Sequence, residues 1–132
     1  MVRFLRFQFP ALLWASLIFA SSAIPTRYYP GVEYSWMPKV VHVVFFFFLC
    51  LFMNLAFRHQ QLLSPLARWS LPISIAVCLT FGILDEVHQM FVPGRHPRIT
   101  DVLLDVSGAI LMALTFLVWD RVQSLRRTQV TS

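Results

Sequence analysis

Acidic side chains fall in the second half of this sequence at spacings that place them on shared helix faces. Asp85 and Glu86 are adjacent, and Gln89 follows Asp85 by four positions. Asp101 and Asp105 are again four positions apart. Residues at i and i+4 are neighbours on a helix surface. Carboxylates gathered in this way can be oxygen ligands of Mg²⁺ or Ca²⁺, acids and bases in catalysis, or partners of cations.

Basic side chains accompany these acids. Lys39 and His42 are three positions apart, so on a helix they share a face. Arg95 and Arg98 lie in the link VPGRHPR, whose Pro-Gly pair is typical of a tight turn. Such a turn brings both arginines directly over the four acids. Arginine binds phosphate or carboxylate through a bidentate fork, and lysine binds as a point charge.

The composition shows what kind of molecule must position these groups. Of the 132 residues, 58% are hydrophobic and only 13% are charged, against roughly 45–50% and about 25% in soluble domains. A soluble globule and a disordered chain are therefore excluded. The net charge is +5, but the basic residues are scattered rather than gathered on one stripe, which excludes a nucleic-acid surface. An integral membrane protein remains.

The chain has room for four membrane-spanning helices. A span needs about 20 largely apolar residues to cross roughly 30 Å of hydrocarbon. An isolated strand would leave its amides unsatisfied in lipid, so an all-α bundle of four transmembrane helices in one domain is predicted. The helices are expected near residues 10–24, 38–57, 71–91 and 99–119.

The basic residues indicate the orientation of these helices. If successive connections alternate between the two sides of the membrane, one side holds seven of the 11 Lys and Arg residues. Those seven are Arg3, Arg6, Arg58, Arg68, Arg121, Arg126 and Arg127. By the positive-inside rule both termini are cytoplasmic, and the polar groups described above lie toward the outer side.

A carboxylate within a membrane span costs free energy, so its presence there indicates a functional site unless a structural role explains it. Asp105 belongs to a helical stripe with Asp101 and Gly108, and the glycine allows a neighbouring helix to approach closely. A plainer interpretation is that the charges are salt bridges and helix caps that close a hairpin. The candidate ligand-binding residues are Lys39, His42, Asp85, Glu86, Gln89, Arg95, Asp101 and Asp105.

Two further patterns have alternative interpretations. The N-terminal segment, with Ala20-Ser21-Ser22-Ala23 after an apolar stretch, is similar to a secretory signal. Its cleavage would leave three helices. Cys50 and Cys78 both fall in the middle of a span, where buried small hydrophobic residues are favoured over a disulfide or a metal pair.

The order of these motifs resembles that of the VanZ-like membrane proteins of bacteria. DExxQxFxPGR begins at Asp85 and is followed by TD at Thr100 and by DxxGA at Asp105. KxxH at Lys39 is similar to the family's second-helix signature, and the serine pair beginning at Ser21 is similar to the pair that ends its first helix. The resemblance covers nearly the whole chain, and its most specific part is the DExxQxFxPGR segment.

The sequence departs from the family pattern at three positions: Pro38, where an acid is frequent, Phe46, where a tyrosine is common, and Asp105, where many members have Asn. The resemblance implies a multi-pass protein of the bacterial cytoplasmic (inner) membrane, in a family named for a member linked to glycopeptide (teicoplanin) resistance. The resemblance does not imply any established reaction.

Three classes of function follow from these residues. The first is a binding module that holds the anionic head group of a lipid, an envelope precursor or a glycopeptide, with Lys39, Arg95 and Arg98 facing phosphate or carboxylate. In this interpretation the acids orient those cations or accept an amine or hydroxyl of the ligand. Membrane lipids are the expected partners, and no cofactor and no nucleic acid is expected.

The second class is a hydrolase or transferase acting on a lipid-linked substrate. Its candidate catalytic residues are His42, Asp85, Glu86 and Asp101. His42 would act as general acid or base, and the acids, with Asp105, would hold a divalent metal. The third class is a scaffold or modulator that packs against a larger envelope protein or against further copies of itself.

Overall fold

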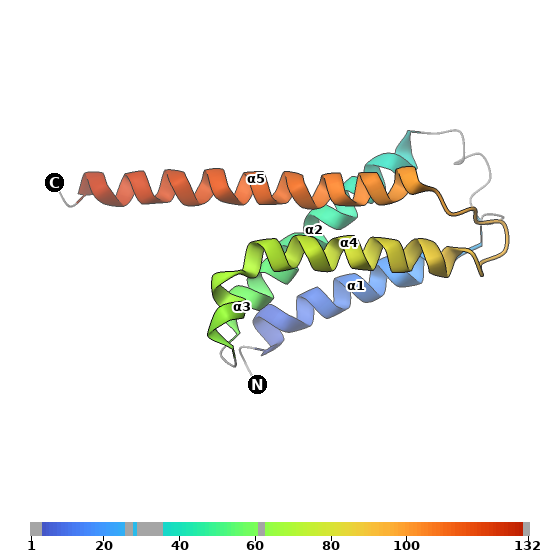
Figure 1. Cartoon of the computed structure of the whole chain (residues 1–132), viewed down its shortest axis with the longest axis horizontal. Helices are drawn as coiled ribbons and strands as arrows, with labels where there is room; N and C mark the ends of the chain where they lie inside the picture. Colours follow the sequence, from blue (N-terminus) through green and yellow to red (C-terminus); the bar gives the residue numbers. More distant parts are fainter. Residues whose placement is uncertain (1–3, 26–27, 29–35, 61–62, 131–132) are drawn as a thin grey trace.

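The fold is entirely helical where it is described. The computed structural model describes residues 4–25, 28, 36–60 and 63–130, and these ranges contain no strand. The elements are the π-helical turn η1 (Phe4–Gln8), α1 (Phe9–Ser22), α2 (Met37–His59), α3 (Ser64–Arg68), α4 (Ser70–Gln89) and α5 (Ile99–Val130) (Figure 1). Four segments are long and apolar enough to cross a membrane: Phe4–Ser22, Met37–His59, Ser70–Gln89 and Ile99–Thr128. The predicted all-α fold is confirmed, and it contains the expected four helices that are long and apolar enough to span a membrane.

The last helix differs most from its prediction. It was expected to end near residue 119, but α5 continues to Val130. The prediction stopped at Asp120 because the apolar run ends there, yet the segment that follows contains neither proline nor glycine and nothing in it breaks a helix. At about 1.5 Å per residue α5 is about 48 Å long, which exceeds the roughly 30 Å of hydrocarbon. The charged end therefore continues the helix beyond the apolar span.

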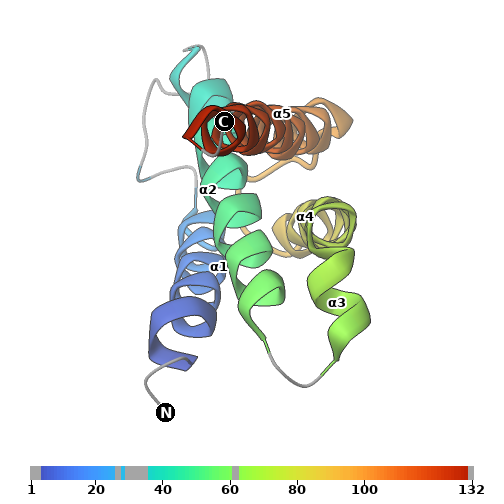
Figure 2. The ribbon, with the colours of Figure 1, turned by 90° about the vertical axis from the view of Figure 1, so that its left-hand side faces the viewer.

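Helix α2 is the centre of the bundle. It packs against η1, α1, α3, α4 and α5, whereas α1 otherwise meets only η1 and, briefly, α4. Figure 2 shows α1 and α4 on opposite sides of α2, with α5 crossing the same helix. The buried core joins all four long helices, and both cysteines lie in it as free thiols, as expected. Its members are Ile18, Phe46, Leu49, Cys50, Cys78, Ala109 and Met112.

A close contact between α5 and α2 depends on Gly108. A Cβ added to this residue would lie 2.2 Å from the carbonyl oxygen of Val43 and 3.1 Å from the backbone nitrogen of Phe47. Side chains larger than hydrogen therefore do not fit between α5 and α2 at this point. The predicted close approach is confirmed, and α2 is the partner helix.

Candidate ligand site at one end of the bundle

A cavity of about 420 Å³ lies where the end of α1, the start of α2, the end of α4 and the start of α5 meet. The link between α4 and α5 completes its wall. This volume lies in the range of small-molecule sites, about 300–1,000 Å³. The charged or polar side chains in the wall include Lys39, His42, Asp85, Gln89, Arg95, Arg98 and Asp101.

The tertiary structure thus gathers most of the predicted site residues around one cavity. Six of the eight ligand-binding candidates are in its wall, and the other two, Glu86 and Asp105, are buried. The wall also includes two side chains absent from the predicted set, Ser21 and Ser22 at the end of α1. The only signal for them in the sequence was the resemblance of this serine pair to the family pattern.

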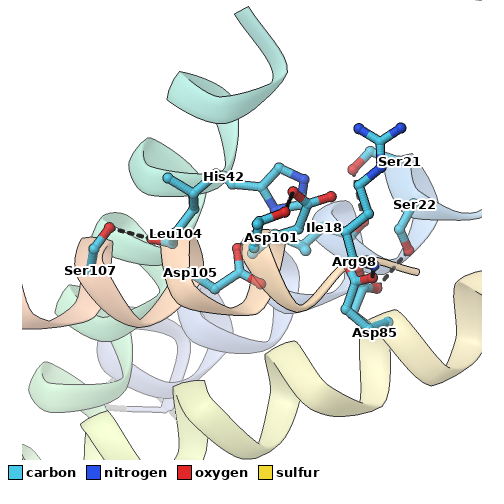
Figure 3. A network of polar contacts seen from close by, with 12 residues as sticks. Ile18, Ser21, Ser22, His42, Asp85, Arg98, Asp101, Leu104, Asp105 and Ser107 are labelled. Carbon is cyan, nitrogen blue, oxygen red and sulfur yellow. Dashed lines mark hydrogen bonds and ion pairs between the residues drawn. The ribbon is translucent and has the colours of Figure 1, made fainter. Parts of the chain in front are cut away.

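His42 of α2, in the wall, forms a close pair with Asp105 of α5, which lies behind the wall (Figure 3). The distance between His42 Nδ1 and Asp105 Oδ1 is 2.8 Å. Asp105 is only 1% exposed, whereas the histidine side chain keeps 21% of its surface and reaches the cavity. The carboxylate lies against Gly82 of α4, whose added Cβ would be 3.0 Å from Oδ2. Three helices therefore hold this pair in place.

Asp85 joins α4 to the end of α1. Ser22 Oγ donates a hydrogen bond of 2.6 Å to Asp85 Oδ1, and Gln89 Nε2 donates one of 2.9 Å to Oδ2. Both carboxylate oxygens therefore have a protein donor, and the residue is 5% exposed. This arrangement fits a structural role for Asp85, in which it links two helices, better than the predicted role as a catalytic acid.

Ser22→Ala is expected to lower the free energy of unfolding by about 2 kcal/mol, because it removes a hydrogen bond to a buried carboxylate. The measurement is SDS-induced unfolding of the purified protein in detergent micelles. Ser16→Ala is the matched control, since its hydroxyl is exposed and bonds only to the carbonyl of Leu12 in its own helix. Equal stability of the two variants would contradict a linking role for Ser22.

Arg95 does not lie on the acids as predicted. Its Nε donates to the carbonyl oxygen of Ile24 at 3.2 Å, and its Nη2 donates to that of Ser21 at 3.3 Å. The Ser21 carbonyl is in the last turn of α1, where carbonyls lack a partner within the helix and carry partial negative charge, so an arginine donor satisfies it well. The turn that places it contains Gly94 with φ of 79°, in the left-handed region. Arg95 thus ties the α4–α5 link to the end of α1.

The second arginine of the link does meet an acid, through its main chain. The backbone nitrogen of Arg98 donates to Glu86 Oε2 at 2.7 Å. Glu86 is 6% exposed, and its other oxygen, Oε1, is buried without a hydrogen-bond partner. In the wall itself, Asp101 is partly buried and accepts a long hydrogen bond of 3.3 Å from the hydroxyl of Thr100.

The arrangement does not resemble a metal centre. Within the part of the chain that the structure describes, no three His, Cys, Asp or Glu side chains are grouped as ligands of one ion would be. The acids are instead divided between separate partners. These side chains therefore do not form a ligand set for the divalent metal that the second class of function, a metal-dependent enzyme, would require.

Comparison with known proteins agrees with the motifs. A family model described as VanZ/LLP1 matches residues 5–120, which is most of the chain and includes every wall residue named above. No curated protein matches the chain. No solved structure matches it either.

Proposed function

The chain belongs to the VanZ/LLP1 family of membrane proteins, and from that premise we propose that it binds a phosphate-bearing amphiphile in the cavity at the end of the bundle. The charge of the wall supports this ligand class. Three cationic side chains line the cavity, those of Lys39, Arg95 and Arg98, against two carboxylates, those of Asp85 and Asp101. These cationic side chains favour an anionic group, and lysine and arginine are the usual partners of phosphate.

The other part of the wall is apolar. Ile18 of α1 lies in it, together with Val41, Phe45 and Phe46 of α2. A cavity with a cationic end and an apolar wall matches a molecule with a phosphate head and a hydrocarbon chain, because each part of that molecule leaves water or lipid for a similar environment. A lipid is the amphiphile that a protein with four spanning helices meets at highest concentration.

The cavity volume narrows the choice between ligands. About 420 Å³ lies in the range of small-molecule sites and fits a lipid head group better than a large ligand. The positive-inside distribution of Lys and Arg supports the orientation that goes with the proposal, in which both termini are cytoplasmic and the cavity serves the outer leaflet of the bacterial inner membrane.

Lys39 is the observation on which the proposal depends. Its side chain is exposed at the cavity wall and has no hydrogen-bond or ion-pair partner among the described residues. Lys39→Met keeps the length of the side chain and removes its charge. We expect this variant to bind a short-chain phospholipid about tenfold more weakly, which corresponds to the loss of one charge-assisted hydrogen bond. The measurement is displacement of a fluorescent lipid from the full-length protein in detergent.

The matched control is Arg121→Met, which removes an exposed cation of α5 far from the cavity. Its affinity for the lipid should equal that of the unchanged protein. The proposal is wrong if Lys39→Met and Arg121→Met bind the lipid equally well, or if the unchanged protein binds none. Arg95 is a poorer choice for this test, since its substitution also releases the end of α1.

A further inference from the structure

The imidazole of His42 has one nitrogen that is bonded within the protein and one that is not. Nδ1 is bonded to Asp105 Oδ1 at 2.8 Å, and that residue is only 1% exposed. Nε2 makes no hydrogen bond within the part of the chain that the structure describes, and it is not one of the buried polar atoms. Since His42 itself lines the cavity, a molecule bound there can reach Nε2.

The carboxylate of Asp105 determines how this imidazole can react. A carboxylate accepts a hydrogen, so the proton of the neutral ring stays on Nδ1 and the lone pair lies on Nε2. Positive charge that develops on the ring during a reaction lies beside the carboxylate and is stabilised by it. Asp105 cannot turn away, because a Cβ added to Gly82 would already be 3.0 Å from its Oδ2. The pair therefore presents an oriented, unprotonated nitrogen to the cavity.

Lys39 places positive charge about one helical turn from His42. The two residues are three positions apart on α2, and both line the cavity. Residues at this spacing are neighbours on a helix surface. Lys39 belongs to the first turn of α2, where the end of the helix adds partial positive charge. A phosphate that binds Lys39 is therefore held close to the free nitrogen of His42.

We propose that the site is catalytic and hydrolyses a lipid phosphate monoester, with His42 as the nucleophile. The inference rests on the proposed function and makes its ligand a substrate. Because Asp105 bonds to the imidazole and lies behind the wall, it is a positioning residue. Lys39 balances the charge of the phosphoryl oxygens.

The reaction has two steps, and water is its only co-reactant. In the first step His42 Nε2 forms a bond to phosphorus, the bond from phosphorus to the lipid oxygen breaks, and that oxygen takes a proton from water. In the second step the oxygen of a water molecule forms a bond to phosphorus, and the electron pair of the broken N–P bond returns to Nε2. Inorganic phosphate leaves, and the proton released from this water replaces the one that the lipid alcohol took up.

The test is turnover of dioctanoyl phosphatidic acid by the full-length protein in detergent, followed as release of inorganic phosphate. Binding is measured separately, by displacement of the same fluorescent lipid. His42→Asn keeps an N–H donor for Asp105 in place of Nδ1 and removes Nε2. We expect this variant to bind the lipid as the unchanged protein does and to lower kcat at least about a thousandfold. His59→Gln, at the exposed other end of α2, should change neither quantity.

Two further measurements distinguish catalysis from a structural role of the pair. The amide of Asp105→Asn can donate to Nδ1, which moves the ring proton to Nε2, so kcat should fall at least about a hundredfold while KM is unchanged. In a single turnover of lipid with a radioactive phosphate, quenched rapidly in alkali, the label should be attached to His42. A pair that only joins α2 to α5 would give neither result.

The outcomes separate the two proposals. The catalytic inference is overturned, while phosphate binding stands, if the protein binds phosphatidic acid but releases no phosphate. Release at an unchanged rate by His42→Asn, or turnover that leaves no label on His42, overturns it as well. If phosphatidic acid does not displace the probe, both proposals fail. The labelling of the unchanged protein decides the matter even if the variants of the pair do not fold.

Discussion

Replacing His42 by leucine is expected to lower the free energy of unfolding by about 3 to 5 kcal/mol, the range found when one partner of a buried ion pair is removed. The substitution leaves the carboxylate of Asp105 in the interior of the bundle without its 2.8 Å partner. Asp105 is 1% exposed and lies against Gly82, so it cannot turn toward water. SDS-induced unfolding in detergent micelles measures the loss.

A double substitution shows whether the uncompensated charge causes this loss. Asp105→Asn keeps the shape of the side chain and removes its charge, so His42→Leu combined with Asp105→Asn should be clearly more stable than His42→Leu alone. The coupling between the two positions is the relevant quantity, because the leucine also changes packing at the cavity. If the effects of the two substitutions simply add, the pair contributes nothing beyond its separate contacts, and the expectation is wrong.

Gly108→Ala is expected to destabilise the bundle by about 3 kcal/mol, at the upper end of the usual cost of an added methyl group in a packed core. The new Cβ would be 2.2 Å from the carbonyl oxygen of Val43, a backbone atom that moves only if α2 and α5 separate. The loss should appear in the same unfolding titration. It should also weaken lipid binding, since both helices supply residues of the cavity wall.

Ser107→Ala is the control for this prediction. Ser107 precedes Gly108 on α5, is exposed, and bonds only to the carbonyl of Leu104. Gly82→Ala gives an intermediate case, because its Cβ would meet a side-chain atom, Asp105 Oδ2, at 3.0 Å. The expected order of stability is therefore Ser107→Ala, then Gly82→Ala, then Gly108→Ala. A Gly108→Ala protein as stable as the control would show that α2 and α5 can separate at little cost.

The position of Arg95 changes how a purely structural role of the cluster can be tested. Exchanging the charges of Asp85 and Arg95 would be informative if the two side chains formed an ion pair. Arg95 instead donates to the carbonyls of Ser21 and Ile24, and Asp85 accepts from Ser22 and Gln89. The two residues act on the same end of α1 through separate bonds, so the exchange is not expected to rescue either single variant.

The sequence alone determined the number of spanning helices and the set of candidate site residues. The helices follow from the length of each apolar run, which is a local property, and from the rule that a backbone in lipid must satisfy its own hydrogen bonds. The candidate site residues follow from the scarcity of charged side chains. Only 13% of the residues are charged, and a charged side chain within a span is costly enough to indicate a function. The role of Gly108 followed from its position on the stripe of Asp101 and Asp105.

The tertiary structure decided which groups meet. His42 and Asp105 are 63 positions apart, as are Ser22 and Asp85, and Arg95 reaches carbonyls more than 70 positions away. Helical periodicity says which residues share a face, but not how each helix is rotated or which neighbour it faces. The helix ends also depended on the fold, since hydropathy marks the end of an apolar run and α5 continues past it. These choices are made by packing between helices, which is not a local property of the chain.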